Sequence, residues 1–531
     1  MKGFLMIKGF RQIASLTALS RVFGLVRDIS FGYFLGAGGL MDAWVIAFRI
    51  PNLARRLFGE GAASASFIPV YSEQLHKDPD KASRLANTVV TLVFMVLAAI
   101  VVLGWTGMGV YRLCCGGNEE TRLILSLTSI TLPYMVMVCV VAILAGVLNV
   151  HCHFASPAAA PIVLNIFIIS SLILAGKVFN VPGRVMVFWV AVGVLIAGIV
   201  QILMQIYPLR RRSIKVSFSL DTHSEGLRKI LLLMGPMIIG LTVTQINTLA
   251  DDIIAWCLSG SEQKGEFFTA FGRQISYPLW RGSVSHLYFS QRLYQFPLGV
   301  LGISLATAIF PVMSSFAASA DYKGLAGSIN KGLKVVILLA LPATIGLILV
   351  RRPLVSALLE HGEFTGSDTV RTGWTLCFYA IGLNAFFAQQ ILTRAFYSLQ
   401  ESKIPMKTAC IAVGANLGLN LTLIWFMGTA GLALSTTISS YLQVGMLSKK
   451  ISNRFSGTLW EDTGIIALKS AVGTVVMGVL VGLVLWTLAG LEKTTKFDII
   501  RLCLAVPAGA GGYWIILKLL RVDLAGFFKT K

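Results

Sequence analysis

The sequence predicts an all-α polytopic membrane protein. Of its 531 residues, 56% are hydrophobic and only 13% are charged, whereas soluble globular chains are about 25% charged. Apolar runs of about 20 residues recur from end to end, and each is long enough to cross ~30 Å of hydrocarbon as a helix. The runs are continuous rather than alternating, so membrane-spanning strands are not expected.

Charged residues and clusters of Gly, Pro or Asn divide the apolar runs into about fourteen expected transmembrane helices. An even number places both termini on the same side of the membrane. The expected ranges are 12–36, 41–72, 86–111, 122–150, 157–179, 185–208, 228–258, 285–317, 332–350, 372–399, 405–427, 430–448, 464–489 and 499–520.

Lysine and arginine residues indicate the orientation of these helices. They are dense in the even-numbered connection 209–229 and nearly absent from the odd-numbered connections 36–41 and 427–430. Because basic loops stay on the cytoplasmic side, both termini are expected in the cytoplasm. The net charge of +21 fits basic loops that face anionic lipid. The alternative is that some basic residues lie inside the membrane and bind an anionic substrate. The long polar segment 259–284 falls on the outer face, and its role is unknown.

The chain contains a short internal repeat. “FIPVYS” at 67–72 recurs as “IFPVMS” at 309–314, and “NVHCHFASP” at 149–157 has a counterpart in “YSLQESKIP” at 397–405. We therefore expect two six-helix lobes related as parallel repeats, followed by two C-terminal helices. Parallel repeats place a substrate site in the cleft between the halves, near the membrane midplane. The expected domains are an N-lobe at 1–225, a C-lobe at 226–455 and a C-terminal helix pair at 456–531.

The sequence offers no enzyme-like site. Its eight cysteines lie mostly in or beside apolar runs, without CxxC or metal-like spacing, so they are interpreted as small buried apolar residues. The connections are too short for a soluble domain, and the two longest carry no metal motif. The first apolar segment has internal charges and no small-residue cleavage site, so a cleaved signal peptide is not expected.

The first expected span contains charges that lipid disfavours. “SRVFGLVRD” at 20–28 holds Arg21, Arg27 and Asp28. Three such charges at a helix centre raise the free energy of membrane insertion by about 7–10 kcal/mol. The apolar residues of the span lower it by only about 3–7 kcal/mol. The charges must therefore face a polar interior or one another. At about 100° per residue, Asp28 points in nearly the same direction as Arg21, which favours a pair between them.

The second span and its counterpart in the second half repeat this pattern. “DAWVIAFRIPNLARR” holds Arg49, Arg55 and Arg56 in an otherwise apolar stretch, and Pro51 can kink it toward a cavity. In the second half, “YFSQRLYQFPLGVLG” holds Arg292. Guanidinium groups are planar, always charged and bidentate, so a cluster of them predicts an anionic headgroup such as a diphosphate.

A different set of polar residues lies in the second half. Asp251 and Asp252 interrupt one apolar run. Asn416 and Asn420 share a helix face because they lie four residues apart, and Thr436 lies in the next span. Carboxylate, amide and hydroxyl oxygens on three spans suit a hard monovalent cation such as Na⁺. The alternative is interhelical hydrogen bonding, which is common for polar residues in membranes and is slightly favoured by spacing alone.

The stretches “SRVFGLVRD” and “GAGGLMDAWVIAFRIPNLARRLFGEGAASASFIPVYSE” resemble the N-terminal signature of the MurJ (MviN) lipid II flippases. These belong to the multidrug/oligosaccharidyl-lipid/polysaccharide exporter superfamily, and the resemblance covers essentially the whole chain. It implies a transporter rather than an enzyme, which moves the undecaprenyl-diphosphate-linked peptidoglycan precursor (lipid II) from the inner to the outer leaflet by alternating access. It also implies a location in the bacterial cytoplasmic (inner) membrane.

The resemblance implies roles for individual residues. In the family, arginines of spans 1, 2 and 8 line a central cationic cavity, and spans 13 and 14 line a groove for the lipid tail. The matching arginines are Arg21, Arg27, Arg55 and Arg292, and the further polar positions are Asp28, Asp42, Asn52 and Glu60. Some members bind Na⁺ as a coupling ion, and no other cofactor is expected. The matching residues are Asp251, Asp252, Asn416, Asn420 and Thr436.

Three other functions are open. Another transporter of the superfamily, such as an O-antigen-type lipid-linked oligosaccharide flippase or a multidrug/cation antiporter, is expected to share the fold, but a drug-cation antiporter should present carboxylates rather than arginines. A membrane enzyme acting on polyprenyl phosphates needs a metal or carboxylate motif on a loop. A non-transporting scaffold does not need buried arginines. The expected partners are lipid II and membrane lipids, and no nucleic acid is expected to bind. The chain is expected to be a monomer that associates with the cell-wall synthesis machinery.

Overall fold

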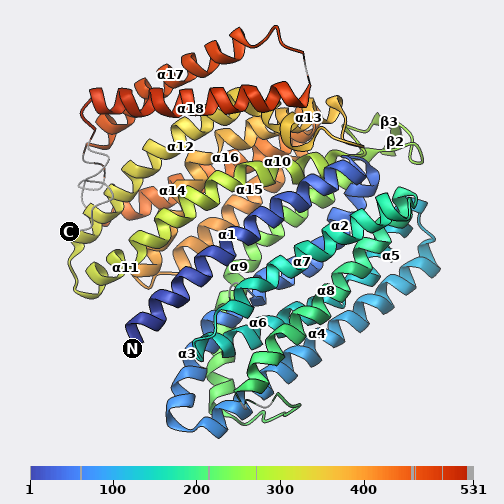
Figure 1. Ribbon diagram of the computed structural model, residues 1–531, viewed down its shortest axis with the longest axis vertical. Coiled ribbons are helices and arrows are strands. Elements are labelled where there is room, and N and C mark those ends of the chain that lie inside the picture. The colour runs from blue at the N-terminus through green and yellow to red at the C-terminus, as the bar shows by residue number, and fades with distance from the viewer. Residues whose placement is uncertain are drawn as a thin grey trace. The chain divides into compact units, whose positions relative to one another are not determined.

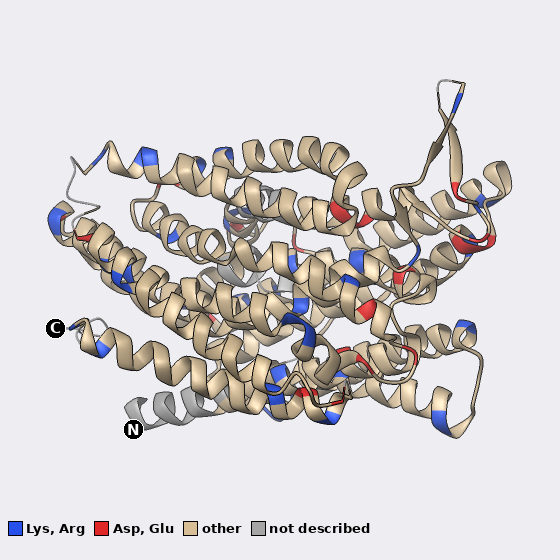
Figure 2. Cartoon of the chain, turned by 90° about the horizontal axis from the view of Figure 1, so that it is seen from above, with Lys and Arg blue, Asp and Glu red and all other residues tan. Residues whose placement is uncertain are grey.

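The computed structural model describes residues 2–59, 62–212, 214, 216–270, 272–455, 460, 462–492 and 494–522. The chain divides into two compact units, residues 1–249 and 250–531, and each is described by itself. Long stretches of helix carry no charged residue (Figure 2). This agrees with the low charged fraction of the sequence.

The first unit contains helices and no strand in its described residues (Figure 1). Helix α1 packs along α7, and α7 packs against α8. The helices are α1 (Lys2–Leu35), α2 (Gly39–Ala54), α3 (Ala62–Lys77), α4 (Pro79–Cys115), α5 (Glu119–Thr131), α6 (Tyr134–Val150), α7 (Ala155–Ile173), α8 (Gly183–Arg211) and the first part of α9 (Glu225–Cys257), with the π-helical turns η1 (Arg55–Gly59) and η2 (Leu174–Val178).

The second unit begins within α9 and, in its described residues, combines helices with four short strands. The helices are α10 (Ser283–Pro297), α11 (Ser304–Ala318), α12 (Tyr322–Leu359), α13 (Gly366–Ile381), α14 (Leu383–Ser398), α15 (Lys403–Met427), α16 (Thr429–Ser452), α17 (Thr463–Thr487) and α18 (Thr495–Leu519), with the π-helical turn η3 (Leu298–Ile303). The strands are β1 (Ser259–Gly260), β2 (Phe267–Ala270), β3 (Arg273–Ser276) and β4 (Leu279–Trp280).

The long polar segment before α10 folds onto itself. Strands β2 and β3 form an antiparallel hairpin, and β1 pairs in parallel with β4. The Arg281 guanidinium lies over the Trp256 ring, 3.4 Å from its centroid, and donates to the Trp256 carbonyl oxygen at 2.9 Å. These contacts hold the end of the segment, just after β4, against the end of α9, and strands β2 and β3 extend away from the helices of their unit (Figure 1).

The predicted fold class is confirmed, because helices overlap all fourteen expected ranges. Within the described part of the chain, nine helices are long and apolar enough to cross a membrane, or ten if the bent pair α13–α14 is one span. The segments that fall short are α1, α2 with α3, α9 and α16, and each of them carries a predicted site residue. Polar residues lower their hydropathy, so the number fourteen stays a prediction.

The internal repeat recurs in the backbone of the two units. Pro51 lies near the end of α2 and Pro297 ends α10, and each helix passes directly into a π-helical turn. The helix that follows contains a proline in both cases, Pro69 in α3 and Pro311 in α11. A proline removes a backbone donor and disturbs the i→i−4 ladder, which favours a π-type irregularity at these positions.

The second pair of repeat sequences forms the same turn twice. Cys152 and Gln400 adopt positive φ angles of 56° and 59°. In each turn, the next backbone N–H donates to the carbonyl oxygen five residues earlier, at 2.9 Å, as in a Schellman motif. Asp78 caps α4 and Asp321 caps α12 through side-chain oxygens. Short sequence matches therefore mark equivalent turns and helix starts in the two units.

The C-terminal helices α17 and α18 pack on each other and on α12. A buried cluster of Val350, Met477, Val481 and Ala505 joins the three helices. The Arg501 guanidinium pairs with Asp498 at 2.6 Å and donates to carbonyl oxygens at the end of α17. The pair thus belongs to the second compact unit, and the predicted groove for a lipid tail stays a prediction.

The close packing of α15 against α16 leads to a testable expectation at Gly431. A Cβ atom at this position would lie 2.5 Å from the Leu423 carbonyl oxygen, and a backbone atom cannot move aside as a side chain can. We expect Gly431→Ala to destabilise the protein by about 1–3 kcal/mol through overpacking. Thermal unfolding of the detergent-solubilised protein measures the effect.

Gly445 in the same helix provides the matched control. A Cβ atom there meets nothing within 4 Å, so Gly445→Ala is expected to be neutral or slightly stabilising. Equal melting temperatures for the two variants would contradict the assignment of Gly431 to a tight backbone crossing.

Candidate functional site

The Arg27 side chain of α1 is held in place by one carboxylate, of Asp28, and one amide, of Asn165. Its guanidinium donates to Asp28 Oδ1 through Nε at 3.0 Å and through Nη2 at 2.7 Å. Its third nitrogen, Nη1, donates to Asn165 Oδ1 of α7 at 3.0 Å. The Arg27 and Asp28 side chains are only 15% and 9% exposed. The arginine is therefore fixed and partly desolvated on an otherwise apolar helix.

The pairing of Asp28 differs from the direction-based expectation that it pairs with Arg21. Arg21 is exposed, and Asp28 forms its ion pair with Arg27. Two residues seven positions apart point the same way, but they are separated by about 10 Å along the helix axis. The long Arg27 side chain can instead curve back to its neighbour, and Asn165 fixes its far end.

A second cationic group forms where α2 passes into η1. Arg55 donates to Asn52 Oδ1 through Nε at 3.1 Å and through Nη2 at 3.0 Å. The adjacent Arg56 donates to Gln245 Oε1 of α9 at 3.0 Å. The structure therefore joins the predicted residues Asn52 and Arg55 directly. The two consecutive arginines at the start of η1 thus have different partners.

Two further residues of the first unit, Asp42 and Glu60, were predicted to belong to the site. Asp42 is fully buried in the first turn of α2, where the partial positive charge of a helix N-terminus favours a carboxylate. Glu60 lies outside the described residues.

Arg292 lies in α10 of the second unit, with its guanidinium carbon 4.7 Å from the centroid of the Tyr288 ring. This cation–π contact orients the side chain along the helix. Polar contacts with α13 hold α10 itself. Gln291 donates to the Tyr379 hydroxyl at 3.1 Å, and the Ser290 hydroxyl donates to the Thr372 carbonyl oxygen at 2.9 Å.

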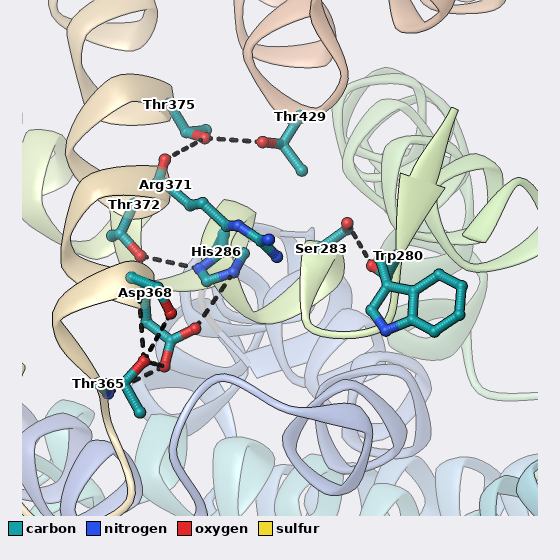
Figure 3. Close-up of polar contacts among 10 residues, drawn as sticks. Trp280, Ser283, His286, Thr365, Asp368, Arg371, Thr372, Thr375 and Thr429 are labelled. Atoms are coloured by element: carbon teal, nitrogen blue, oxygen red, sulfur yellow. Dashed lines mark hydrogen bonds and ion pairs between the residues drawn. The ribbon is translucent and has the colours of Figure 1, made fainter. Parts of the chain in front are cut away.

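A buried histidine completes this contact between α10 and α13 (Figure 3). His286 Nδ1 lies 3.0 Å from the Thr372 hydroxyl, and Nε2 lies 3.6 Å from Asp368 Oδ1. Asp368 also accepts the backbone N–H of Thr365 in a capping box that starts α13. These contacts set the register of α10 and therefore the position of Arg292.

The predicted cation residues of the second unit converge on Asp251. The Asn420 side-chain NH₂ donates to Asp251 Oδ1 at 2.6 Å, and the Thr436 hydroxyl donates to Oδ2 at 3.4 Å. Asn420 also donates to Asn416 Oδ1 at 2.9 Å. Asp252 is fully buried and takes part in none of these three bonds. Asp251 is therefore the acidic member of the cluster.

The donor set suits a monovalent cation. It supplies amide and hydroxyl oxygens around the buried Asp251 carboxylate, and such hard ligands favour ions like Na⁺ over soft metals. Asn420 presents its NH₂ to the carboxylate here, so a bound cation requires that amide to rotate and present Oδ1. Among the residues that the structure describes, no group of three or more His, Cys, Asp or Glu side chains is gathered to hold a metal ion.

Three partners were not predicted from the sequence. Asn165 interrupts the apolar run of α7, and this interruption is the signal that marks it. Ser439 lies three residues after Thr436 and takes a bond from Asn416 at 3.5 Å. His286 is buried at the start of α10, and nothing in its local sequence distinguishes it from a loop histidine.

The sequence matches a known family along most of its length. A family model described as “Lipid II flippase MurJ” matches residues 31–502. A probable lipid II flippase MurJ from Vibrio cholerae is 31% identical over 529 residues, covering 96% of this chain and 95% of that protein. A protein of the same description from Buchnera aphidicola is 30% identical over 533 residues, covering 98% and 99%.

Solved structures give the same result for the fold. A structure titled “Lipid II flippase MurJ, inward closed conformation” matches with a TM-score of 0.74 and 25% identity, over 96% of this chain and 99% of that chain. An inward-facing multidrug resistance MATE family transporter of the MOP superfamily matches with a TM-score of 0.68 and 14% identity, over 84% and 98%. The second likeness concerns the fold alone.

Proposed function

The chain belongs to the MurJ family of lipid II flippases, and from this membership we propose that it moves lipid II between leaflets with the arginines of its first unit as headgroup-binding residues. It is a multi-pass membrane protein whose substrate is a lipid. The observation that supports the binding role is the fixed, partly buried guanidinium of Arg27 on an apolar helix. A guanidinium that faces lipid is energetically costly. The same group can form two parallel hydrogen bonds with the oxygens of a diphosphate.

The Arg27–Asp28 pair suits a site that must capture and then release its substrate. Without substrate, Asp28 neutralises the guanidinium, so the helix does not carry an uncompensated charge. Diphosphate oxygens then compete with Asp28 for the same donors, while Asn165 keeps the guanidinium oriented. Arg21, Arg55 with Asn52, Asp42 and Glu60 complete the set that we propose in the first half, and Arg292 has the matching role in the second.

We propose that the C-terminal helices contact the polyprenyl tail. Both expose large apolar side chains, among them Leu468, Trp486 and Leu519, and such surfaces suit contact with hydrocarbon chains. The headgroup residues and the tail surface would then divide an amphipathic substrate between polar and apolar contacts.

We also propose that the Asp251 cluster binds Na⁺ as a coupling ion. Asn416, Asn420 and Thr436 would contribute oxygens, and the buried carboxylate would supply the charge; Asp252 would add negative potential nearby. Binding energy that differs between two conformations shifts their populations, so a Na⁺ gradient could reset the transporter by alternating access.

The proposed setting is the bacterial cytoplasmic (inner) membrane, with both termini in the cytoplasm. Basic residues concentrated in 209–229, from the end of α8 to the start of α9, support this orientation. We propose that the chain acts as a monomer that associates with the cell-wall synthesis machinery.

Rescue of a cell depleted of its own lipid II flippase tests the proposed function. We expect the wild-type chain to restore growth and shape, and Arg55→Gln to lose about tenfold or more of the activity, because one charge-assisted contact is removed. Arg184→Ala is the matched control, because this exposed arginine pairs only at the surface with Glu119. Failure of a well-expressed wild-type chain would favour another lipid-linked glycan as substrate.

A further inference from the structure

The connection between α8 and α9 is bound along one side of α4. After α8 ends, residues 216–221 belong to no helix or strand. Three alternate backbone N–H groups, of Ser217, Ser219 and Asp221, donate to α4 side-chain oxygens at 3.1–3.3 Å. The acceptors are Asn87, Thr91 and Thr88. The polar residues of this apolar helix and the backbone of the connection therefore satisfy each other.

This anchoring decides which side chains of the connection remain exposed. Because every second N–H group is directed at α4, we infer an extended course. Side chains alternate along such a segment, so Val216, Phe218 and Leu220 share one face. They are 37%, 79% and 53% exposed. The Phe218 ring packs edge-on against Phe94 of α4, with centroids 5.8 Å apart. The connection thus presents an apolar face beside α4 rather than a polar loop surface.

The neighbouring surface of α4 identifies the environment of this face. Phe94, Met95 and Val96 are all about half exposed, and they lie in one of the most apolar candidate spans. Such residues face lipid in a membrane helix. Because Phe218 touches Phe94, the apolar face of 216–220 continues a lipid-facing surface. Non-helical backbone beside lipid needs its polar groups satisfied, which the α4 side chains provide for three of the N–H groups.

Basic residues directly before the connection complete the pattern. Arg210, Arg211 and Arg212 are exposed at the end of α8. Arg211 lies over the ring of Tyr207, 4.7 Å from its centroid, and tyrosine is enriched at the membrane–water interface. Juxtamembrane arginines are attracted to anionic lipid headgroups. Apolar and cationic groups are therefore arranged side by side, as at an interfacial anchor.

We propose that residues 210–212 and 216–221 form an interfacial anchor for an anionic phospholipid leaflet. Val216, Phe218 and Leu220 insert at the boundary between headgroups and acyl chains, and Arg210, Arg211 and Arg212 bind the phosphates. The anchor fastens the connection that leads into α9 to the leaflet as well as to α4. This surface is separate from the headgroup-binding arginines and does not depend on which lipid is transported.

Photo-crosslinking of the full-length protein in nanodiscs tests the anchor. Phe218 or Leu220 is replaced by p-benzoylphenylalanine, and phospholipid adducts are measured by mass spectrometry in discs of phosphatidylcholine alone or mixed with phosphatidylglycerol. Thr222, exposed beyond Asp221, is the control position. We expect adduct yields at 218 and 220 to exceed the yield at 222 by about fivefold or more, because only the first two insert.

The lipid composition separates insertion from charge recognition. We expect the yield at 218 to rise in discs with phosphatidylglycerol, and this rise to disappear in a variant with Arg210, Arg211 and Arg212 all changed to Gln. Equal yields at 218, 220 and 222 would overturn the anchor, and equal yields in the two kinds of disc would overturn its preference for an anionic leaflet. Monodispersity of each variant on gel filtration shows that it is folded.

Discussion

The double variant Arg27→Gln/Asp28→Asn is expected to lower lipid II translocation about 10- to 100-fold while the chain stays folded in the membrane. Removing both charges leaves no unpaired carboxylate, and the neutral amides can still bond to each other and to Asn165. Loss of a bidentate, charge-assisted contact with the diphosphate corresponds to about a 10- to 100-fold loss of transport. Accessibility of lipid II at the outer leaflet of a flippase-depleted cell measures the effect.

Two further variants decide whether the charge or its geometry matters. Arg27→Lys keeps the positive charge but loses the planar fork, so we expect intermediate transport. Arg184→Ala removes an exposed arginine of the same unit and should leave transport unchanged. Normal transport by the folded double variant would rule out Arg27 as a headgroup-binding residue.

The second large effect is expected at Asp251. In the wild-type protein, Na⁺ is expected to raise the melting temperature relative to the same concentration of choline, because a ligand that binds only the folded state stabilises it by about 2.7 kcal/mol at 100 times its Kd. Asp251→Asn removes the only formal charge among the bonded members of the cluster. We expect the Na⁺-specific shift to be lost in this variant.

Asp368→Asn is the control for this measurement. Asp368 also lies in the second unit and accepts hydrogen bonds, but it caps α13 instead of joining the Asp251 cluster. This variant should melt at a lower temperature and keep the shift caused by Na⁺. A wild-type protein that responds equally to Na⁺ and choline would show that the cluster only links α9, α15 and α16.

Much of the fold was predictable because lipid imposes one dominant constraint. Apolar runs of sufficient length must become helices, and the structure has helices over every expected range. The breaks were harder to predict. Pro51 marks a possible kink in the sequence, but only the structure shows a π-helical turn at Arg55–Gly59, because that outcome depends on how the neighbouring helices satisfy the backbone.

The candidate sites were predictable where local spacing decides the contact. Asn416 and Asn420 lie four residues apart, and the structure joins them at 2.9 Å. Contacts between distant helices were not predictable in this way. Asn165 lies 138 residues from Arg27, and helix direction alone favoured the wrong arginine as the partner of Asp28. Side-chain reach and tertiary neighbours decided that pairing.

The contact between Arg27 and Asn165 also has a consequence in time. Helix α1 is one of the segments that fall short of a spanning helix in hydropathy, and its polar partner is synthesised 138 residues later. At about 5–20 residues per second, the ribosome needs roughly 7–30 s to reach Asn165. The first helix of the chain is therefore synthesised early, but its polar contact with α7 forms only later. The order of synthesis and the order of stable insertion thus differ.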